Sequence, residues 1–174
     1  MKTTTKRVSK IEDRCSVLEK MIVSIAPYYD ELNEDQQRML STTIGAALFY
    51  IPHAEKMCYS GFVSTEVHTK LLSGEKVSLT KEHMIPRRVS ALELIEKART
   101  NSPLNLLEEY LSRYSRFNYV LPSENKRLIR FQKKENFTTP EEAYSAAGIS
   151  LVPLSLDELR VLKRNCDINV KSPA

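Results

Sequence analysis

The spacing of apolar residues changes within this chain. Val77 and Leu79 alternate with polar neighbours, which is typical of a strand with one buried face, whereas most other segments show the intervals of three and four that indicate amphipathic helices. A second short apolar run, residues 119–121, ends at Pro122 and precedes a segment with Leu128 and Phe131 on one side. The chain is therefore expected to be an α+β protein in which a short β-hairpin is embedded in mainly helical structure.

The first helix is predicted over residues 8–25. Its apolar residues follow a heptad-like spacing: Val8, Ile11, Cys15, Leu18, Ile22 and Ile25. Such a stripe would either pack on its own domain or form the seam of a homodimer. Because the stripe is shorter than three heptads, packing within the domain is favoured, and the homodimer through residues 8–25 stays open.

A second helix is predicted from Asn33, which can form a capping box with Gln36, to the residue before Pro52. The small residues Gly45, Ala46 and Ala47 would let another helix approach it closely. Residues 1–54 are therefore expected to form an N-terminal helical hairpin.

Residues 55–72 suit either a short helix or strands. Ser73 and Gly74 form a turn signal, so residues 69–72 and 76–80 are expected to pair as a hairpin. Two helices are predicted next, over residues 89–99 and over residues 103–114 with Ser102 as the cap. These helices would be an insertion into a core spanning residues 55–137.

Residues 138–174 are expected to form a C-terminal helical segment and a tail. Thr139 can cap one helix, and Ser155 with Glu158 can form the capping box of another. Residues 167–174 are expected to be a loose tail.

Composition excludes some classes of protein. The 174 residues carry a net charge of +4, which is compatible with a polyanionic partner, and no run of eighteen apolar residues indicates a membrane span. Cys15, Cys58 and Cys166 are widely spaced, which argues for a reducing, cytoplasmic compartment and against a structural zinc site.

The run E-H-M-I-P at residues 82–86, with N-Y-V-L-P-S-E-N-K-R at residues 118–127, resembles the HNH, or ββα-metal, endonucleases. The closest likeness is to the HNH domain of RNA-guided CRISPR nucleases. The resemblance implies a ββα-metal core in which His83 is the general base, Glu82 and Asn125 are metal ligands, and Asn118 braces the histidine loop.

Physical chemistry is consistent with these roles. Glu82 and Asn125 offer the oxygen ligands that Mg²⁺ prefers, with Mn²⁺ as the alternative, and a neutral imidazole can accept a proton from water near neutral pH. A bound metal can stabilise the leaving oxygen of a phosphodiester. Neighbouring residues of a regular strand point to opposite sides, so Glu82 and His83 would converge only if the backbone through Met84, Ile85 and Pro86 is irregular.

The expected function is metal-dependent hydrolysis of nucleic acid, with double-stranded DNA as the expected partner. The alternative is a non-catalytic nucleic-acid-binding or regulatory protein with a degenerate HNH-like motif, and a third option is a helical interaction module that dimerises through residues 8–25. Basic residues beside the proposed site would contact the phosphate backbone: Arg87, Arg88, Lys126, Arg127, Arg130, Lys133 and Lys134.

Overall fold

The computed structural model describes residues 2–51, 55–100, 103–134, 139–166 and 168–171, with the backbone alone for residues 2–9, 133–134 and 168–171. The chain divides into two compact units. Unit 1 comprises Met1–Ala54 and Ile85–Ser115, and unit 2 comprises Glu55–Met84 and Arg116–Ala174. The helices expected as an insertion thus group with the N-terminal hairpin, and residues 138–174 group with the strands.

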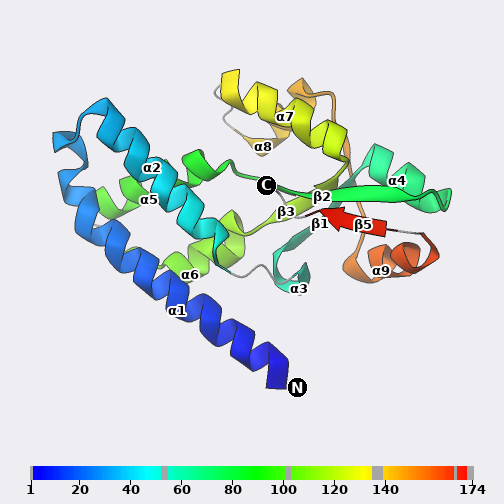
Figure 1. Ribbon diagram of the computed structural model, residues 1–174, viewed down its shortest axis with the longest axis horizontal. Coiled ribbons are helices and arrows are strands. Elements are labelled where there is room, and N and C mark those ends of the chain that lie inside the picture. The colour runs from blue at the N-terminus through cyan, green and yellow to red at the C-terminus, as the bar shows by residue number, and fades with distance from the viewer. Residues whose placement is uncertain (1, 52–54, 101–102, 135–138, 167, 172–174) are drawn as a thin grey trace. The chain divides into compact units, whose positions relative to one another are not determined.

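The described part of unit 1 is helical (Figure 1). Asn33 caps the helix over Glu34–Phe49, and its capping box with Gln36 is formed as predicted. The helix over Arg87–Arg99 is followed along the chain by a short helix, Leu106–Glu109, which Asn105 caps. The predicted cap, Ser102, lies outside the described residues. In chain order the elements are α1 (Lys2–Ile25), the 3-10 helix η1 (Ala26–Glu31), α2 (Glu34–Phe49), α5 (Arg87–Arg99), α6 (Leu106–Glu109) and the π-helical turn η2 (Tyr110–Tyr114).

The apolar stripe of α1 is buried within unit 1. Ile11, Cys15, Leu18 and Ile22 are each at most 4% exposed, so these side chains serve the core of their own unit. This arrangement corresponds to packing of residues 8–25 within their own domain, the first of the two alternatives given above.

Helices α2 and α5 approach each other closely at Gly45. A Cβ atom on Gly45 would lie 2.9 Å from the backbone oxygen of Arg87, which is shorter than real Cβ contacts allow. The prediction that small residues here admit another helix is therefore confirmed, and the contact explains why residue 45 lacks a side chain.

Unit 2 is built on a five-stranded sheet with the strand order β4-β1-β3-β2-β5. Strands β1 and β3 are parallel, as are β2 and β5, while β2 with β3 and β1 with β4 are antiparallel. The elements are α3 (Glu55–Cys58), β1 (Tyr59–Ser64), α4 (Thr65–Leu72), β2 (Val77–His83), β3 (Phe117–Val120), α7 (Pro122–Lys134), α8 (Pro140–Ala146), β4 (Leu151–Pro153), α9 (Leu156–Asn165) and β5 (Ile168–Lys171). The α+β class with mainly helical structure is confirmed.

Two local predictions for unit 2 are wrong. Residues 69–72 belong to helix α4 instead of a hairpin strand, because Ser64 caps the helix by accepting a hydrogen bond from the Val67 backbone and because Val67 and Leu71 bury one side of it. Within the expected tail, residues 168–171 form strand β5, which pairs with β2. Thr139 caps α8 and Ser155 forms a capping box with Glu158 at the start of α9, both as predicted.

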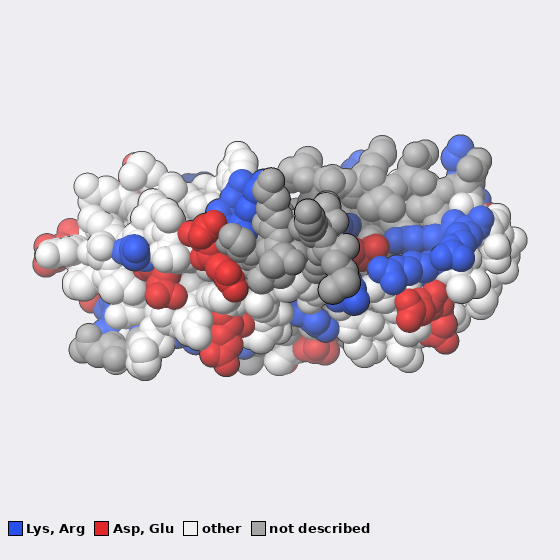
Figure 2. Space-filling model, turned by 90° about the horizontal axis from the view of Figure 1, so that it is seen from below, with Lys and Arg blue, Asp and Glu red and all other residues white. Residues whose placement is uncertain are grey.

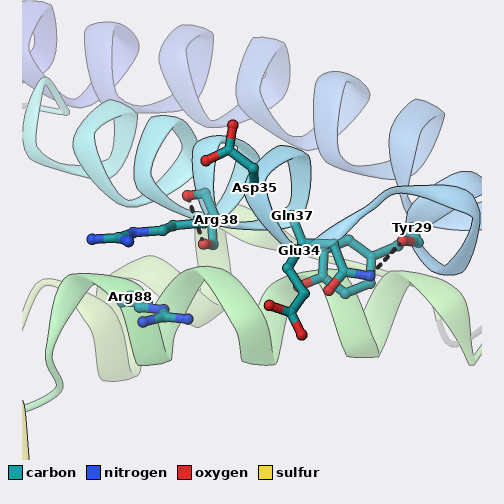
Figure 3. A pocket seen from close by; sticks show the side chains of 7 residues that line it. Tyr29, Glu34, Asp35, Gln37, Arg38 and Arg88 are labelled. Carbon is teal, nitrogen blue, oxygen red and sulfur yellow. Dashed lines mark hydrogen bonds between the residues drawn. The ribbon is translucent and has the colours of Figure 1, made fainter.

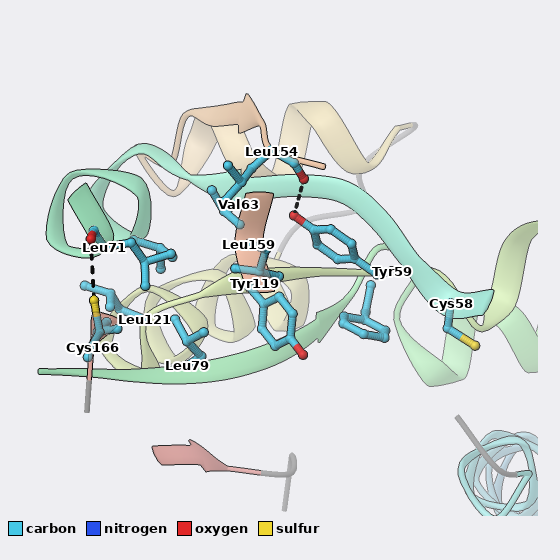
Figure 4. Packing of buried hydrophobic residues seen from close by; sticks show 13 residues of the cluster. Cys58, Tyr59, Val63, Leu71, Leu79, Tyr119, Leu121, Leu154, Leu159 and Cys166 are labelled. Carbon is cyan, nitrogen blue, oxygen red and sulfur yellow. Dashed lines mark hydrogen bonds between the residues drawn. The ribbon is translucent and has the colours of Figure 1, made fainter. Parts of the chain in front are cut away.

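Apolar residues pack on both faces of the sheet. On one face, Leu79 of β2 and Tyr119 of β3 pack with residues of α4 and α9, and the Tyr59 hydroxyl donates a hydrogen bond to the Leu154 carbonyl oxygen (Figure 4). On the other face, Val120 packs with Leu128 of α7 and with residues of α8. Helices α7 and α9 therefore cover opposite faces of the sheet, as Figure 1 shows.

Candidate functional site around Glu82

Glu82 and His83 lie on opposite faces of the sheet. Strand β2 remains regular through both residues, since Glu82 pairs with Asn118 and His83 pairs with Phe117 of the antiparallel strand β3. The alternation of a regular strand therefore sends the carboxylate and the imidazole to different sides. The predicted convergence of these two side chains is not seen, because the irregular backbone that it needs begins only after His83.

His83 is half-buried on the face that α9 covers. Its ring lies edge-on to the Phe117 ring, with 6.3 Å between the ring centroids. The Lys81 ammonium lies on the same face, 5.0 Å from the centroid of that Phe117 ring. The imidazole thus shares its surroundings with an aromatic ring and a cation instead of with Glu82.

Glu82 ends a chain of hydrogen bonds inside unit 2. The Ser60 hydroxyl donates to the Asn118 amide oxygen, and the Asn118 amide nitrogen donates to the Tyr144 hydroxyl at 2.8 Å. The Tyr144 hydroxyl in turn donates to Glu82, and the Gln132 side chain of α7 also hydrogen bonds to this carboxylate. Asn118 therefore hydrogen bonds to Tyr144, whereas the HNH resemblance implies that it braces the histidine loop.

Burial dominates the acid–base properties of this network. Glu82 is 6% exposed, and the cost of removing its charge from water raises its pKa to about 7, although the hydrogen bonds from Tyr144 and Gln132 act in the opposite direction. Burial, with the nearby Glu82 carboxylate, also raises the pKa of the Tyr144 phenol above its usual range. Glu82 can therefore exchange a proton near neutral pH inside an enclosed polar network.

The residues expected to hold a divalent metal do not form one ligand group. The Glu82 carboxylate is occupied by Tyr144 and Gln132, and His83 is on the other face of the sheet. Asn125 is half-buried on α7, seven residues before Gln132 and so about 10 Å from it along the helix axis. Among the described residues, no group of three or more His, Cys, Asp and Glu side chains could hold a metal ion.

The predicted phosphate-contacting residues are divided between the two units. In unit 1, the Arg87 guanidinium lies over the Phe49 ring at 3.0 Å from its centroid, and burial lowers the pKa of this arginine. Arg88 is exposed and lines a cavity of about 470 Å³ between α2 and α5, and Arg38, Glu34 and Asp35 of α2 also line this cavity (Figure 3).

The remaining predicted contacts lie on α7 in unit 2. Leu128 turns into the core, whereas Lys126, Arg127 and Arg130 are exposed. The side chains of Lys133 and Lys134 lie outside the described residues. Within the part of the chain that the structure describes, no ion pair involves the three exposed cations of α7. Ion pairs elsewhere are Lys70–Glu75, Lys97–Glu109, Arg99–Asp30, Arg99–Glu96, Arg113–Glu93, Arg160–Asp157 and Lys163–Glu55.

A second set of cations lies on α9, on the other side of the sheet. Figure 2 shows a band of Lys and Arg side chains in this region with acidic side chains beside it. Arg160 pairs with Asp157, and Lys163 pairs with Glu55. Acidic partners therefore neutralise a part of the α9 band, which distinguishes it from α7.

Sequence reasoning missed Tyr144, Gln132 and Ser60. One signal was available: Asn118 lies between Phe117 and Tyr119 in a short strand, and a polar side chain buried in such a strand needs hydrogen-bond partners. That signal indicates that partners exist, but it does not identify a tyrosine 26 residues further along the chain.

None of the described helices has the length and apolar character that a membrane crossing requires. Comparisons of the chain with protein-family models, with curated proteins and with solved structures found no match.

Proposed function

We propose that unit 2 binds nucleic acid through the exposed cations of α7. The observation that carries this proposal is the absence of acidic partners for Lys126, Arg127 and Arg130 among the described residues, whereas six cations on other elements form ion pairs. Three cations on one helix attract a polyanion, and no ion pair with another described residue has to be broken first.

The spacing of these cations suits a phosphate backbone. Lys126 and Arg130 are four residues apart and therefore neighbours on the helix surface, and Arg127 adjoins Lys126. Lysine acts as a point charge, whereas the planar arginine guanidinium can form two parallel hydrogen bonds to a phosphate. Contacts of this kind provide affinity without reading the base sequence.

A comparison of two matched double variants tests the proposal. Lys126→Gln with Arg130→Gln removes two cations one turn apart on α7, and Arg160→Gln with Arg164→Gln does the same on α9. Fluorescence anisotropy with a labelled duplex and a labelled single strand is expected to show weaker binding for the α7 variant, by about tenfold or more at low salt. Equal weakening by the α9 variant, or no binding by the unaltered protein, would contradict the proposal.

Metal-dependent cleavage of nucleic acid is the second candidate function, and one observation favours it. Strand β2, the antiparallel strand β3 and helix α7 occur in the order that the HNH resemblance implies, and Glu82 lies on the face of the sheet that α7 covers. His83 is not part of that group, so a cleavage activity would have to depend on Glu82 without His83 in its present position.

Plasmid nicking in the presence of Mg²⁺ or Mn²⁺ tests this second candidate. Cleavage that a chelator stops and that Glu82→Gln abolishes would support it. If the protein retains DNA at low salt but leaves it intact with either ion, the binding function alone stands. Loss of cleavage in His83→Ala, with an unchanged circular dichroism spectrum, would show that His83 reaches the site in the active protein.

A further inference from the structure

Unit 2 contains a cavity of about 520 Å³ beside the N-terminal half of α7, and no residue of the Glu82 network lines it. Its walls come from α4, from α7 and from the segment before β4. The volume is in the range of sites that bind small molecules or parts of larger ligands. The charged residues that line it are Glu66, Lys70, Glu75, Glu124 and Arg127.

Glu124 gives this cavity a fixed hydrogen-bond acceptor. Its side chain is only 3% exposed, and one carboxylate oxygen, Oε2, accepts hydrogen bonds from the Ser64 hydroxyl at 2.6 Å and from the Leu121 backbone at 2.7 Å. The other oxygen, Oε1, accepts none from the described residues. Oε1 is not one of the buried polar atoms that lack a partner, so it contacts the solvent of the cavity and is open to a ligand that donates a hydrogen bond.

Arg127 gives the same cavity a donor. Its Nε donates to the Ala147 carbonyl oxygen at 2.6 Å, which holds the guanidinium against the segment before β4. The two terminal nitrogens have no partner among the described residues. In the same cavity the Lys70 ammonium is paired with Glu75 at 2.9 Å, so Arg127 is the cation that remains available there within the described part of the chain.

We propose that this cavity takes up one unpaired nucleobase, whose amino group donates to Glu124 Oε1 while Arg127 donates to a ring nitrogen or a carbonyl oxygen of the base. The inference rests on the proposed binding of nucleic acid by α7, because Lys126 and Arg130 on the same helix would hold the adjoining phosphates. Unit 2 would accordingly bind single strands, or unpaired bases within a duplex, in preference to fully paired DNA.

The chemistry predicts which bases fit. A carboxylate only accepts hydrogen bonds, and the amino group of cytosine donates two hydrogens beside an acceptor ring nitrogen that suits an arginine. Thymine offers one donor, its ring N–H, flanked by two carbonyl oxygens that a carboxylate repels. Cytosine and thymine are similar in size and stacking, so a difference in affinity between them reports on hydrogen bonding.

Binding of oligo(dC) and oligo(dT) of equal length at neutral pH tests the inference. The unaltered protein is expected to bind oligo(dC) about tenfold more tightly than oligo(dT), because one additional hydrogen bond to the Glu124 carboxylate favours cytosine by about that factor. Glu124→Gln keeps an oxygen that accepts from Ser64 and Leu121 but places an amide N–H donor in the cavity. The preference for oligo(dC) is therefore expected to disappear or to invert. Glu66→Gln removes the same charge from an exposed residue of the same cavity and is expected to leave the preference unchanged.

The outcomes separate this inference from the proposed function. Equal affinity of the unaltered protein for the two oligonucleotides would overturn the inference and leave binding by α7 intact. Retention of the cytosine preference in Glu124→Gln would also overturn it. If Lys126→Gln with Arg130→Gln weakens binding to both oligonucleotides equally, α7 holds the backbone in both complexes. No binding of either oligonucleotide or of a duplex would refute both proposals.

Discussion

The Tyr144 hydroxyl of α8 donates a hydrogen bond to the Glu82 carboxylate of β2, from 62 residues further along the chain. The same hydroxyl accepts a hydrogen bond from Asn118 of β3, so one phenol joins two strands and a helix. Because each member of this chain of hydrogen bonds polarises the next, the network acts as a unit whose members depend on one another.

Glu82 is expected to make the stability of unit 2 depend on pH. Its pKa is about 7 in the folded protein against an ordinary value of 4.5 for a glutamate in water, so the folded state binds the proton more tightly than the unfolded state does. The free energy of unfolding should therefore be highest below pH 4.5 as far as Glu82 is concerned, fall as the pH rises towards 7, and level off above 7. This one group should account for a loss on the order of 3 kcal/mol.

The difference between the protein and Glu82→Gln isolates this effect, since the other titrating groups are common to both. Urea unfolding at acidic and mildly alkaline pH should show a smaller decline for Glu82→Gln. Parallel pH profiles for the two proteins would mean that Glu82 titrates normally and that the carboxylate is hydrated.

Tyr144→Phe is expected to destabilise unit 2 by roughly 2–4 kcal/mol, because it removes one of the two side-chain donors of the Glu82 carboxylate, leaving Gln132, and takes the acceptor from the Asn118 amide. The loss should be larger above pH 7, where the Glu82 carboxylate is charged. Urea unfolding measures it, with Tyr28→Phe as the control because Tyr28 is 55% exposed. In the double variant with Glu82→Gln the cost should shrink, and strictly additive costs would show that the two residues are not coupled.

Gly45→Ala is expected to destabilise unit 1 although alanine is the better helix former. The new Cβ would lie 2.9 Å from the Arg87 backbone oxygen, and the resulting displacement of α5 should cost roughly 1–3 kcal/mol. Helix propensity acts in the opposite direction by about 1 kcal/mol. A lowered melting temperature is therefore expected, whereas a raised one would mean that α2 and α5 are further apart than the structure places them.

Local signals in the sequence predicted much of the secondary structure. Asn33, Thr139 and Ser155 each begin a helix as predicted, because a capping box depends on residues only three positions apart. The period-two alternation at Val77 and Leu79 correctly predicted a strand, which continues to His83. These features need no knowledge of the rest of the chain.

Partners distant in sequence could not be predicted in this way. Strand β5 pairs with β2 from about ninety residues away, and residues 168–171 carry too weak a pattern to reveal it. The geometry of the candidate site could not be predicted for the same reason, because it depends on strand partners that are distant in sequence. Glu82 and His83 can converge only if the pairing of β2 with β3 stops before them, but it continues to His83. The motif in the sequence does not indicate where this pairing ends.

The salt dependence of nucleic-acid binding tests the central claim most directly. A plot of log affinity against log salt concentration should have a negative slope on duplex DNA, made shallower by about 1.8 in Lys126→Gln with Arg130→Gln because two phosphate contacts are lost. Arg160→Gln with Arg164→Gln on α9 should leave the slope unchanged. If the slope is the same with and without the two α7 cations, α7 is not the surface that contacts the phosphates, and the proposed function is wrong.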